Sequence, residues 1–380
     1  MPADRRMGNE QQSSFPATAD QLLRATVERG GSDMHLTVGV PPQARIHGDL
    51  IAFDYPPLYP KDVEALIYSI LDEQQVKRLQ EKWELDFSYS VPGVARFRGN
   101  IMFQRNSMSA VFRVVPFDIP DFDKLGMPPA VRQICDLTRG LVLVTGPTGS
   151  GKSTTLAAVL NIINRERCEN IVTVEDPIEF LHKHMKSTIR QREVGIDTHS
   201  FADALRHVLR QDPDVILIGE MRDLDSISIA LTAAETGHLV FSTLHTQTAP
   251  LTVSRIVDVF QDHRREQVRQ QLANSLRAVV CQQLLPTADG KGRVAAVEFM
   301  VDTPAVRNMI REGKDHQLYS AIQTGQAQGM QTLDRALHDL FRAGKITRET
   351  ALEYCVDKAE LERLLGGGPG PATRSGGWRG

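Results

Sequence analysis

The feature that most constrains this chain is a Gly-rich loop that joins a short apolar run to a helix-forming stretch. Residues 141–145 read Leu-Val-Leu-Val-Thr, and residues 146–153 read Gly-Pro-Thr-Gly-Ser-Gly-Lys-Ser. A short apolar run bounded by Gly is typical of a buried strand. Strand, loop and helix in this order are the context that a phosphate-binding loop requires. A Gly-rich turn without a ligand is the alternative, and the matching context on both sides favours nucleotide binding.

Each residue type in this loop has a chemical role to fill. Glycines let backbone N–H groups turn toward phosphate oxygens, where the positive end of the following helix adds its field. Lys152 is expected to reach the terminal phosphates, and Ser153 to hold Mg²⁺ through its hydroxyl group. The predicted nucleotide-binding residues are Gly146, Pro147, Thr148, Gly149, Ser150, Gly151, Lys152, Ser153 and Thr154.

Composition argues against several classes of protein. The 44 Lys and Arg residues against 47 Asp and Glu leave a net charge of −3, so no overall basic excess indicates nucleic acid or an anionic membrane as a partner. The four cysteines lie far apart without a C-x-x-C pair, which favours neither a disulfide framework nor a zinc cluster and fits a reducing cytoplasm. No apolar run approaches the roughly 20 residues that span a bilayer. A role at a membrane is therefore expected to go through partners.

The chain is long enough for more than one domain, and its composition changes along its length. Residues 1–18 are polar and charged at the start, and are predicted to be a disordered tail. Residues 19–115 show helical and alternating patterns that predict a small α+β domain with an antiparallel sheet. Residues 116–129, rich in Pro and Asp, predict a linker. An α/β domain with C-terminal helices is expected over 130–365, and a flexible Gly-rich tail over 366–380.

The second domain alternates strands with helices, which predicts a parallel sheet covered by helices on both faces. Ligands of such sheets gather at the carboxyl ends of the strands. The predicted strands are 141–145, 171–174, 215–218 and 238–242, and the predicted helices lie near 153–164, 201–209 and 226–235.

One group of carboxylates follows the second of these strands. Glu175, Asp176 and Glu179 come directly after an apolar run, beside the expected phosphate and Mg²⁺. They are candidates to position the attacking water or to hold the hydration shell of the metal. A capped turn is the alternative, because Asp-Pro favours turns by itself. Function is favoured, since a charge at a buried strand end is costly without a partner.

The next strand ends in Gly219-Glu220, where most P-loop enzymes place an Asp that holds Mg²⁺ through water. We therefore assign Glu220 as the residue that orients or deprotonates the attacking water, with Glu175 or Glu179 in support. The alternative is a surface ion pair between Glu220 and Arg222, which would contribute little.

Two histidines flank the last predicted strand. His238 lies at its start and His245 just past its end. His245 shares the edge of the phosphate loop and is a candidate sensor of the γ-phosphate. A hydrogen-bonded structural role is the alternative for either residue, and their spacing does not favour a metal site.

Arginines recur in the strands of the first domain, at Arg96, Arg98, Arg105 and Arg113. The simple interpretation is a solvated sheet face. The other is contact with phosphate, in this chain or in a neighbouring subunit, because the guanidinium group neutralises phosphate charge during transfer.

Taken together, these motifs resemble the secretion-type hexameric ATPases, and within them the type IV pilus retraction (twitching motility) ATPases. The resemblance covers about 19–365. It is carried by residues 30–36, 146–155, 175–179, 191–194, 219–223, 232–238, 243–246 and 329–334.

This resemblance implies a PAS-like N-terminal domain, a RecA-like ATPase domain and a homo-hexameric ring with ATP sites at the subunit boundaries. It implies that Lys152 and Ser153 serve the phosphates and Mg²⁺. Arg98 and Arg113 would reach the ATP as the two domains close.

The resemblance also implies roles at the strand ends. Glu220 matches the catalytic acidic residue, and Glu179 lies in the aspartate box of the family. His238 and His245 belong to its histidine box.

The implied function is a motor that hydrolyses ATP to retract type IV pili. Related assembly and secretion ATPases carry a tetracysteine zinc module after the histidine box, whereas this region holds only Cys281, which favours retraction. Residues 304–311 resemble a retraction-linked helix, with an ordinary amphipathic helix as the alternative. The implied partners are an inner-membrane platform protein and related pilus ATPases. The implied location is cytoplasmic, peripheral to the inner membrane at the pilus base.

Two other functions stay open. Residues 103–106 and 286–293 are similar to the accessory retraction paralogue, which would act in the ring with little turnover of its own. A conjugation or DNA-transport ATPase of the same superfamily is the other, and stimulation of its turnover by single-stranded DNA would favour it.

Overall fold

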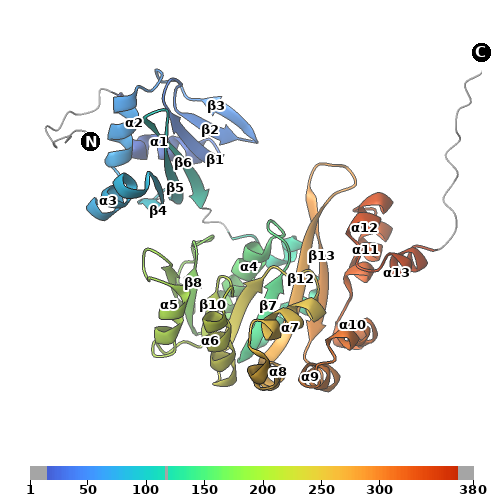
Figure 1. Cartoon of the computed structure of the whole chain (residues 1–380). Helices are drawn as coiled ribbons and strands as arrows, with labels where there is room; N and C mark the ends of the chain where they lie inside the picture. The colour runs from blue at the N-terminus through green and yellow to red at the C-terminus, as the bar shows by residue number, and fades with distance from the viewer. Residues whose placement is uncertain (1–14, 116–118, 367–380) are drawn as a thin grey trace, which may run out of the picture. The chain divides into compact units, whose positions relative to one another are not determined.

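The computed structural model describes residues 15–115 and 119–366, and the chain divides into two compact units, Met1–Asp118 and Ile119–Gly380 (Figure 1). No helix of the described residues is both long enough and apolar enough to cross a membrane. The predictions for the N-terminal tail up to residue 14, and for the C-terminal tail from residue 367, lie outside the described residues.

Within residues 15–115, six strands form one sheet in the order β3-β2-β1-β6-β5-β4, with antiparallel pairing throughout. This confirms the antiparallel sheet that the alternating pattern predicts. The elements are α1 (Ala19–Glu28), β1 (Gly31–Thr37), β2 (Gln43–Ile46), β3 (Asp49–Ala52), α2 (Pro60–Tyr68), α3 (Glu73–Lys82), β4 (Glu84–Val91), β5 (Ala95–Gln104) and β6 (Ser107–Val115).

Alternation along the strands gives this sheet one apolar and one polar face. Met34, Phe97 and Phe112 are fully buried in the core that the helices cover. Arg98 and Arg113 are direct cross-strand partners and point to the other face, as strand geometry requires of neighbours in alternate positions.

The folded part of this unit begins earlier than the sequence predicts. Phe15 and Ala17 are buried in the core, and Phe15 packs against the ring of Tyr55. Thr18 caps α1 in a capping box with Gln21. The prediction of a disordered tail is therefore wrong for residues 15–18. Their neighbours in the sequence are mostly polar, but two apolar side chains among them pack in the core.

Within residues 119–366, seven strands form the second sheet in the order β13-β12-β7-β11-β10-β8-β9, parallel except for β13. The strands are β7 (Gly140–Thr145), β8 (Asn170–Glu175), β9 (Thr188–Glu193), β10 (Val215–Ile218), β11 (Leu239–Leu244), β12 (Leu276–Pro286) and β13 (Arg293–Val301). β9, β12 and β13 have no counterpart among the predicted strands. β9 is charged and lies at the edge, and β12 follows a helix with no turn residue between them.

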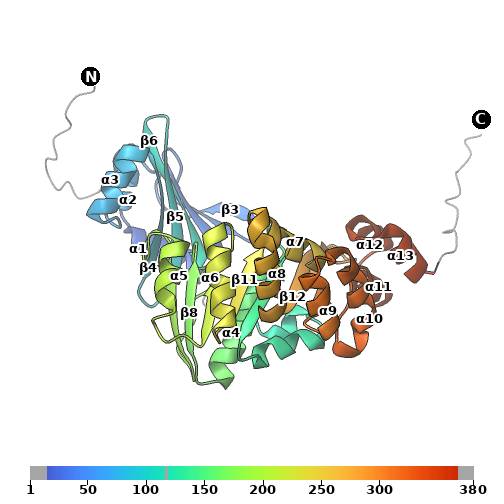
Figure 2. The same ribbon diagram turned by 60° about the horizontal axis from the view of Figure 1, so that its bottom comes forward.

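Helices cover both faces of this sheet (Figure 2). Val142 and Phe241 pack on the side of α4, whereas Leu141 and Val240 pack on the side of α5 to α8. The parallel sheet with two covered faces is as predicted. The helices are α4 (Lys152–Glu166), α5 (Phe201–Val208), α6 (Leu224–Glu235), α7 (Ala249–Asp258), α8 (Asp262–Ser275), α9 (Pro304–Arg311), α10 (Leu318–Thr324), α11 (Leu333–Arg342), α12 (Arg348–Tyr354) and α13 (Lys358–Leu364), with short 3-10 turns η1 (Phe122–Leu125), η2 (Pro129–Asp136), η3 (Asp315–Gln317) and η4 (Gly325–Gln328).

The second half of the predicted linker is packed. Phe122, in η1, is 5% exposed and joins the core beside α4, and Leu125 and Met127 pack against the same core. A single aromatic side chain in a Pro-rich and Asp-rich stretch is enough to dock it, because an aromatic ring buries a large apolar area. Residues 119–129 therefore belong to the second unit.

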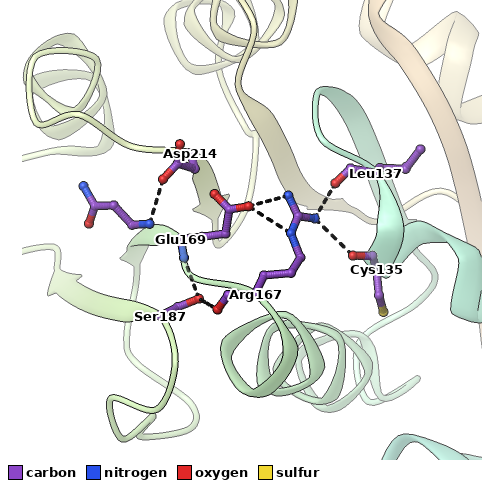
Figure 3. Close-up of polar contacts among 7 residues, drawn as sticks. Cys135, Leu137, Arg167, Glu169, Ser187 and Asp214 are labelled. Atoms are coloured by element: carbon purple, nitrogen blue, oxygen red, sulfur yellow. Dashed lines mark hydrogen bonds and ion pairs between the residues drawn. The ribbon is translucent and has the colours of Figure 1, made fainter.

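Polar bonds close the edge of the sheet at which β8 begins (Figure 3). The Arg167 guanidinium group donates to the backbone oxygens of Cys135 and Leu137 and pairs with Glu169 at 2.8 Å. The Ser187 hydroxyl group donates to the Arg167 backbone oxygen at 2.6 Å. These bonds tie the end of η2 to the start of β8, and the opposite edge of the sheet carries the predicted site.

Candidate nucleotide-binding site

The carboxyl ends of β7, β8, β10 and β11 meet at one edge of the second sheet, where they line a cavity of about 540 Å³. Four separate segments of the chain contribute to it because parallel strands end at the same edge. The predicted residues that line it are Thr148, Gly149, Gly151, Lys152, Ser153, Thr154, Glu175, Glu179, Glu220 and His245.

The Gly-rich loop has the backbone that its sequence predicts. Gly146, Gly149 and Gly151 all have positive φ angles, and α4 begins at the next residue, Lys152. Lys152 is 9% exposed, and its ammonium group donates to the backbone oxygens of Gly146 at 2.9 Å and Pro147 at 3.0 Å. Burial lowers the pKa of Lys152, against the pull of two nearby carboxylates. The loop thus holds a cation in reach of the cavity.

Glu220 lies just past β10 and is held by two partners. Its carboxylate pairs with Arg222 at 2.8 Å and with His245 at 3.2 Å, and its side chain is 19% exposed. Burial acts to raise the pKa of Glu220, but Arg222 and His245 outweigh it and lower the pKa. The carboxylate is therefore ionised at neutral pH, as a proton acceptor must be. The Glu220–Arg222 pair that the sequence raises as an alternative is present, and it lies within the cavity wall.

Glu175 is in a different environment. It is 8% exposed and accepts hydrogen bonds from the Thr173 hydroxyl group at 2.7 Å and the Gln191 amide at 3.1 Å. Burial raises its pKa. Glu179, four residues later, is exposed at the cavity. Glu175 thus organises the turn after β8, which contains a cis bond between Asp176 and Pro177, while Glu179 faces the cavity.

His238 lies at the opposite edge of the sheet from His245. β11 begins at Leu239, one residue after His238, and its six residues separate the backbones of the two histidines by roughly 20 Å. The His238 Nδ1 atom lies 3.0 Å from the Ala233 backbone oxygen and 3.3 Å from the Thr236 hydroxyl group. Within one chain the structure does not bring His238 to the cavity. Its geometry fits the structural role that the sequence offers as the alternative.

Arg98 and Arg113 belong to the first unit, on β5 and β6. The Arg113 guanidinium group bonds the buried Asp33 carboxylate at 2.8 Å, although 68% of the Arg113 side chain is exposed. Their contact with ATP stays a prediction, because these arginines belong to the first unit and the cavity belongs to the second.

Several residues that line the cavity are not among those that the sequence predicts. Phe180, His182, Phe201 and Arg293 line the cavity, and burial lowers the pKa of His182 to about 4, which keeps its imidazole neutral. These residues lie in loops, at a helix start or on an unpredicted strand, so no local spacing indicates them. Their position near the carboxyl edge is the only signal in the sequence.

The cavity also suits Mg²⁺. In the described part of the chain, no group of three or more His, Cys, Asp or Glu side chains is arranged to hold a metal ion. Mg²⁺ in nucleotide sites takes few ligands from protein and several from phosphate and water. The Ser153 hydroxyl group at the start of α4, with Glu179 and Glu220 nearby, provides the oxygen donors that this ion prefers.

Comparison with known proteins gives consistent results. Residues 87–352 match the family described as type II/IV secretion system protein. The chain is 53% identical over 333 residues to the type IV pilus retraction ATPase PilT of Pseudomonas aeruginosa, which spans 88% of this chain and 96% of that protein. It is 41% identical over 346 residues to the type IV pilus ATPase PilU of the same organism, over 91% of this chain and 90% of PilU.

A solved structure agrees with these relatives. The crystal structure of the pilus retraction motor PilT with bound ADP superposes with a TM-score of 0.86 at 49% identity, over 91% of this chain and 99% of that chain. The predicted fold, a parallel α/β domain preceded by a smaller α+β domain, is confirmed.

Proposed function

The chain belongs to the family of type II/IV secretion system proteins, among the ATPases similar to PilT, and from that premise we propose that it hydrolyses ATP to power type IV pilus retraction and twitching motility. One observation carries the proposal: the Gly-rich loop, Glu220 and His245 share one cavity. Fold alone does not imply function, so the site is what matters.

The proposed reaction is the attack of water on the γ-phosphorus of ATP. A bond forms between the water oxygen and phosphorus, and the bond from phosphorus to the β-phosphate oxygen breaks, which leaves ADP and phosphate. Loop N–H groups and Lys152 bind the negative charge, as in other P-loop enzymes. Glu220 orients the water and takes its proton, and His245 and Arg222 keep that carboxylate in place. When bound, Mg²⁺ supplies charge neutralisation at the phosphates.

We further propose that the working form is a homo-hexamer at the cytoplasmic side of the inner membrane. ATP binding would close the two units, with Arg98 and Arg113 on the phosphates, and hydrolysis and release would reopen them. The ring would turn a platform protein in the membrane, so that pilin subunits leave the base of the fibre. What supports this is the similarity to a retraction motor over most of the chain.

The central test is Glu220→Gln. The amide keeps the size of the side chain but cannot accept the proton, so kcat for ATP should fall about a hundredfold or more. Binding of ADP should stay near that of the parent. Glu235→Gln, at the exposed end of α6, is the matched control. Unchanged turnover in Glu220→Gln would overturn the assignment.

The cellular role is tested by deletion in the source bacterium. Loss of a retraction motor should leave cells with excess pili and no twitching. Cells left without pili would instead indicate an assembly motor.

A second candidate is an accessory ATPase similar to PilU, favoured by 41% identity to that protein over most of the chain. Such a protein would show little turnover alone and more when mixed with a retraction ATPase. Steady-state assays of the purified chain, alone and in mixture, distinguish the two. Stimulation by single-stranded DNA would instead favour a DNA-transport ATPase.

A further inference from the structure

One buried side chain on β12 contacts the Gly-rich loop, although about 130 residues separate them in sequence. Gln282 is 3% exposed. Its Nε2 atom donates to the Ser150 backbone oxygen at 2.7 Å, and its Oε1 atom accepts from the Thr155 hydroxyl group at 2.8 Å. Thr155 lies in the first turn of α4. A single carboxamide thus joins the loop to the helix that follows it.

Two of the loop glycines leave space for this residue. A Cβ atom at Gly146 would lie 2.1 Å from the Gln282 backbone oxygen, and one at Gly151 would lie 2.7 Å from Gln282 Nε2. A Cβ atom at Gly149 would meet nothing within 4 Å. Positions 146 and 151 therefore favour glycine for two reasons: β12 approaches them closely, and both have positive φ angles.

The bond to Ser150 also sets the direction of an N–H group. The Ser150 carbonyl and the Gly151 N–H belong to one planar trans peptide, so they point in opposite directions. Holding the carbonyl toward the Gln282 side chain turns the Gly151 N–H away from that side chain, and Gly151 itself lines the cavity. N–H groups of such loops are the donors that bind phosphate.

We propose that Gln282 is a positioning residue for phosphate binding, which orients the Gly151 N–H and the first turn of α4 toward the diphosphate of a bound nucleotide. This inference rests on the proposed function. A carboxamide suits the position because it donates and accepts at once, whereas Glu can only accept and Leu can do neither.

The test measures ADP affinity by calorimetry on the full chain. Gln282→Leu should weaken ADP binding about tenfold, the scale expected when a buried hydrogen bond that organises a site is lost. Gln282→Glu should weaken it further, because a carboxylate would face the Ser150 carbonyl oxygen and add negative charge next to the loop. Thr155→Val should lose part of the affinity, and Thr155→Ser should keep it.

Gln283→Leu is the matched control. Gln283 is the next residue on β12, is 9% exposed and, by strand alternation, faces away from the loop. Its replacement should leave ADP affinity within twofold of the parent. The melting temperature without nucleotide is measured for every variant, so that loss of fold is separated from loss of affinity.

Two results would overturn the proposal. One is parent-like ADP affinity in folded Gln282→Leu. The other, if Gln282→Leu does not fold, is parent-like affinity in both Gln282→Glu and Thr155→Val. Lys152→Ala is run in parallel: if it too binds ADP as the parent does, the proposed function fails, and if it alone loses affinity, only this inference fails.

Discussion

At the scale of single residues, two carboxylates at the carboxyl ends of the parallel strands, Glu220 and Glu175, have different environments. Arg222 and His245 outweigh burial and lower the pKa of Glu220, whereas burial raises the pKa of Glu175. Environments that push two pKa values apart are typical of sites that assign different roles to like groups. Glu220 therefore stays ionised at the cavity, where it can orient a water, and Glu175 is bonded into the turn by Thr173 and Gln191.

A carboxylate outside the nucleotide cavity gives a prediction for stability. Glu298 on β13 is fully buried and accepts from the Ala249 N–H at 2.6 Å, at the start of α7. Burial raises the pKa of Glu298 to about 7. The folded state therefore keeps a proton that the unfolded state releases between about pH 4.5 and 7.

Because the folded pKa is raised, this contribution to stability is fully present below the unfolded pKa and is lost as pH rises through about 7. Glu298→Gln mimics the protonated form at every pH. The free energy of unfolding of the variant minus that of the parent should increase by on the order of 2 to 3 kcal/mol from pH 5 to pH 8. Urea unfolding at both pH values measures this, with Glu235→Gln as an exposed control. A constant difference between parent and variant would contradict it.

At the scale of elements, the short turn η1 is packed against the core of the second unit, although its sequence predicts a linker. It docks residues 119–129 on the core beside α4, through the buried ring of Phe122. Since α4 starts at Lys152, a stretch that resembles a linker packs against the helix that carries the phosphate loop.

Phe122→Ala should therefore destabilise the second unit. Removing a buried aromatic ring costs about 3 to 5 kcal/mol through lost burial and the cavity left behind. Chemical unfolding followed by far-UV circular dichroism measures the change in the free energy of unfolding. Asp121→Ala, at the exposed cap of the same turn, is the control and should change stability by less than about 0.5 kcal/mol. Equal stability of the two variants would show that the turn is not docked in solution.

At the scale of the whole molecule, the two units carry complementary parts of the proposed motor. The second unit holds the nucleotide cavity, and the first presents Arg98 and Arg113 side by side on the polar face of its sheet. Two arginines of the second unit, Arg222 and Arg293, line the cavity, and Arg222 pairs with Glu220. The proposed closure of the units would add Arg98 and Arg113 to neutralise charge in the transition state.

If these arginines act on the phosphates, Arg98→Ala and Arg113→Ala should lower kcat by as much as roughly a thousandfold while ADP still binds. Arg24→Ala, exposed on α1, should retain parent turnover. Because loss of Arg113 also removes the partner of the buried Asp33, the melting temperature is followed for each variant. Parent-like kcat in both variants would leave the solvated sheet face as the better interpretation.

The sequence by itself determined the features that depend on neighbours in the chain. The order of strand, Gly-rich loop and helix around Lys152 is local, and so is the placing of Glu220 and His245 just after buried strands. Parallel strands end at one edge, so these local patterns were enough to predict that the segments meet.

The tertiary structure decided whatever depends on contacts between distant segments. Gln282 lies about 130 residues from the loop it bonds, and no spacing in the chain relates the two. Likewise, Phe15 and Phe122 stand in polar stretches, and only a complementary core shows that they are buried. Local patterns report backbone preference and burial period, whereas the partner of a buried side chain is set by packing across the whole fold.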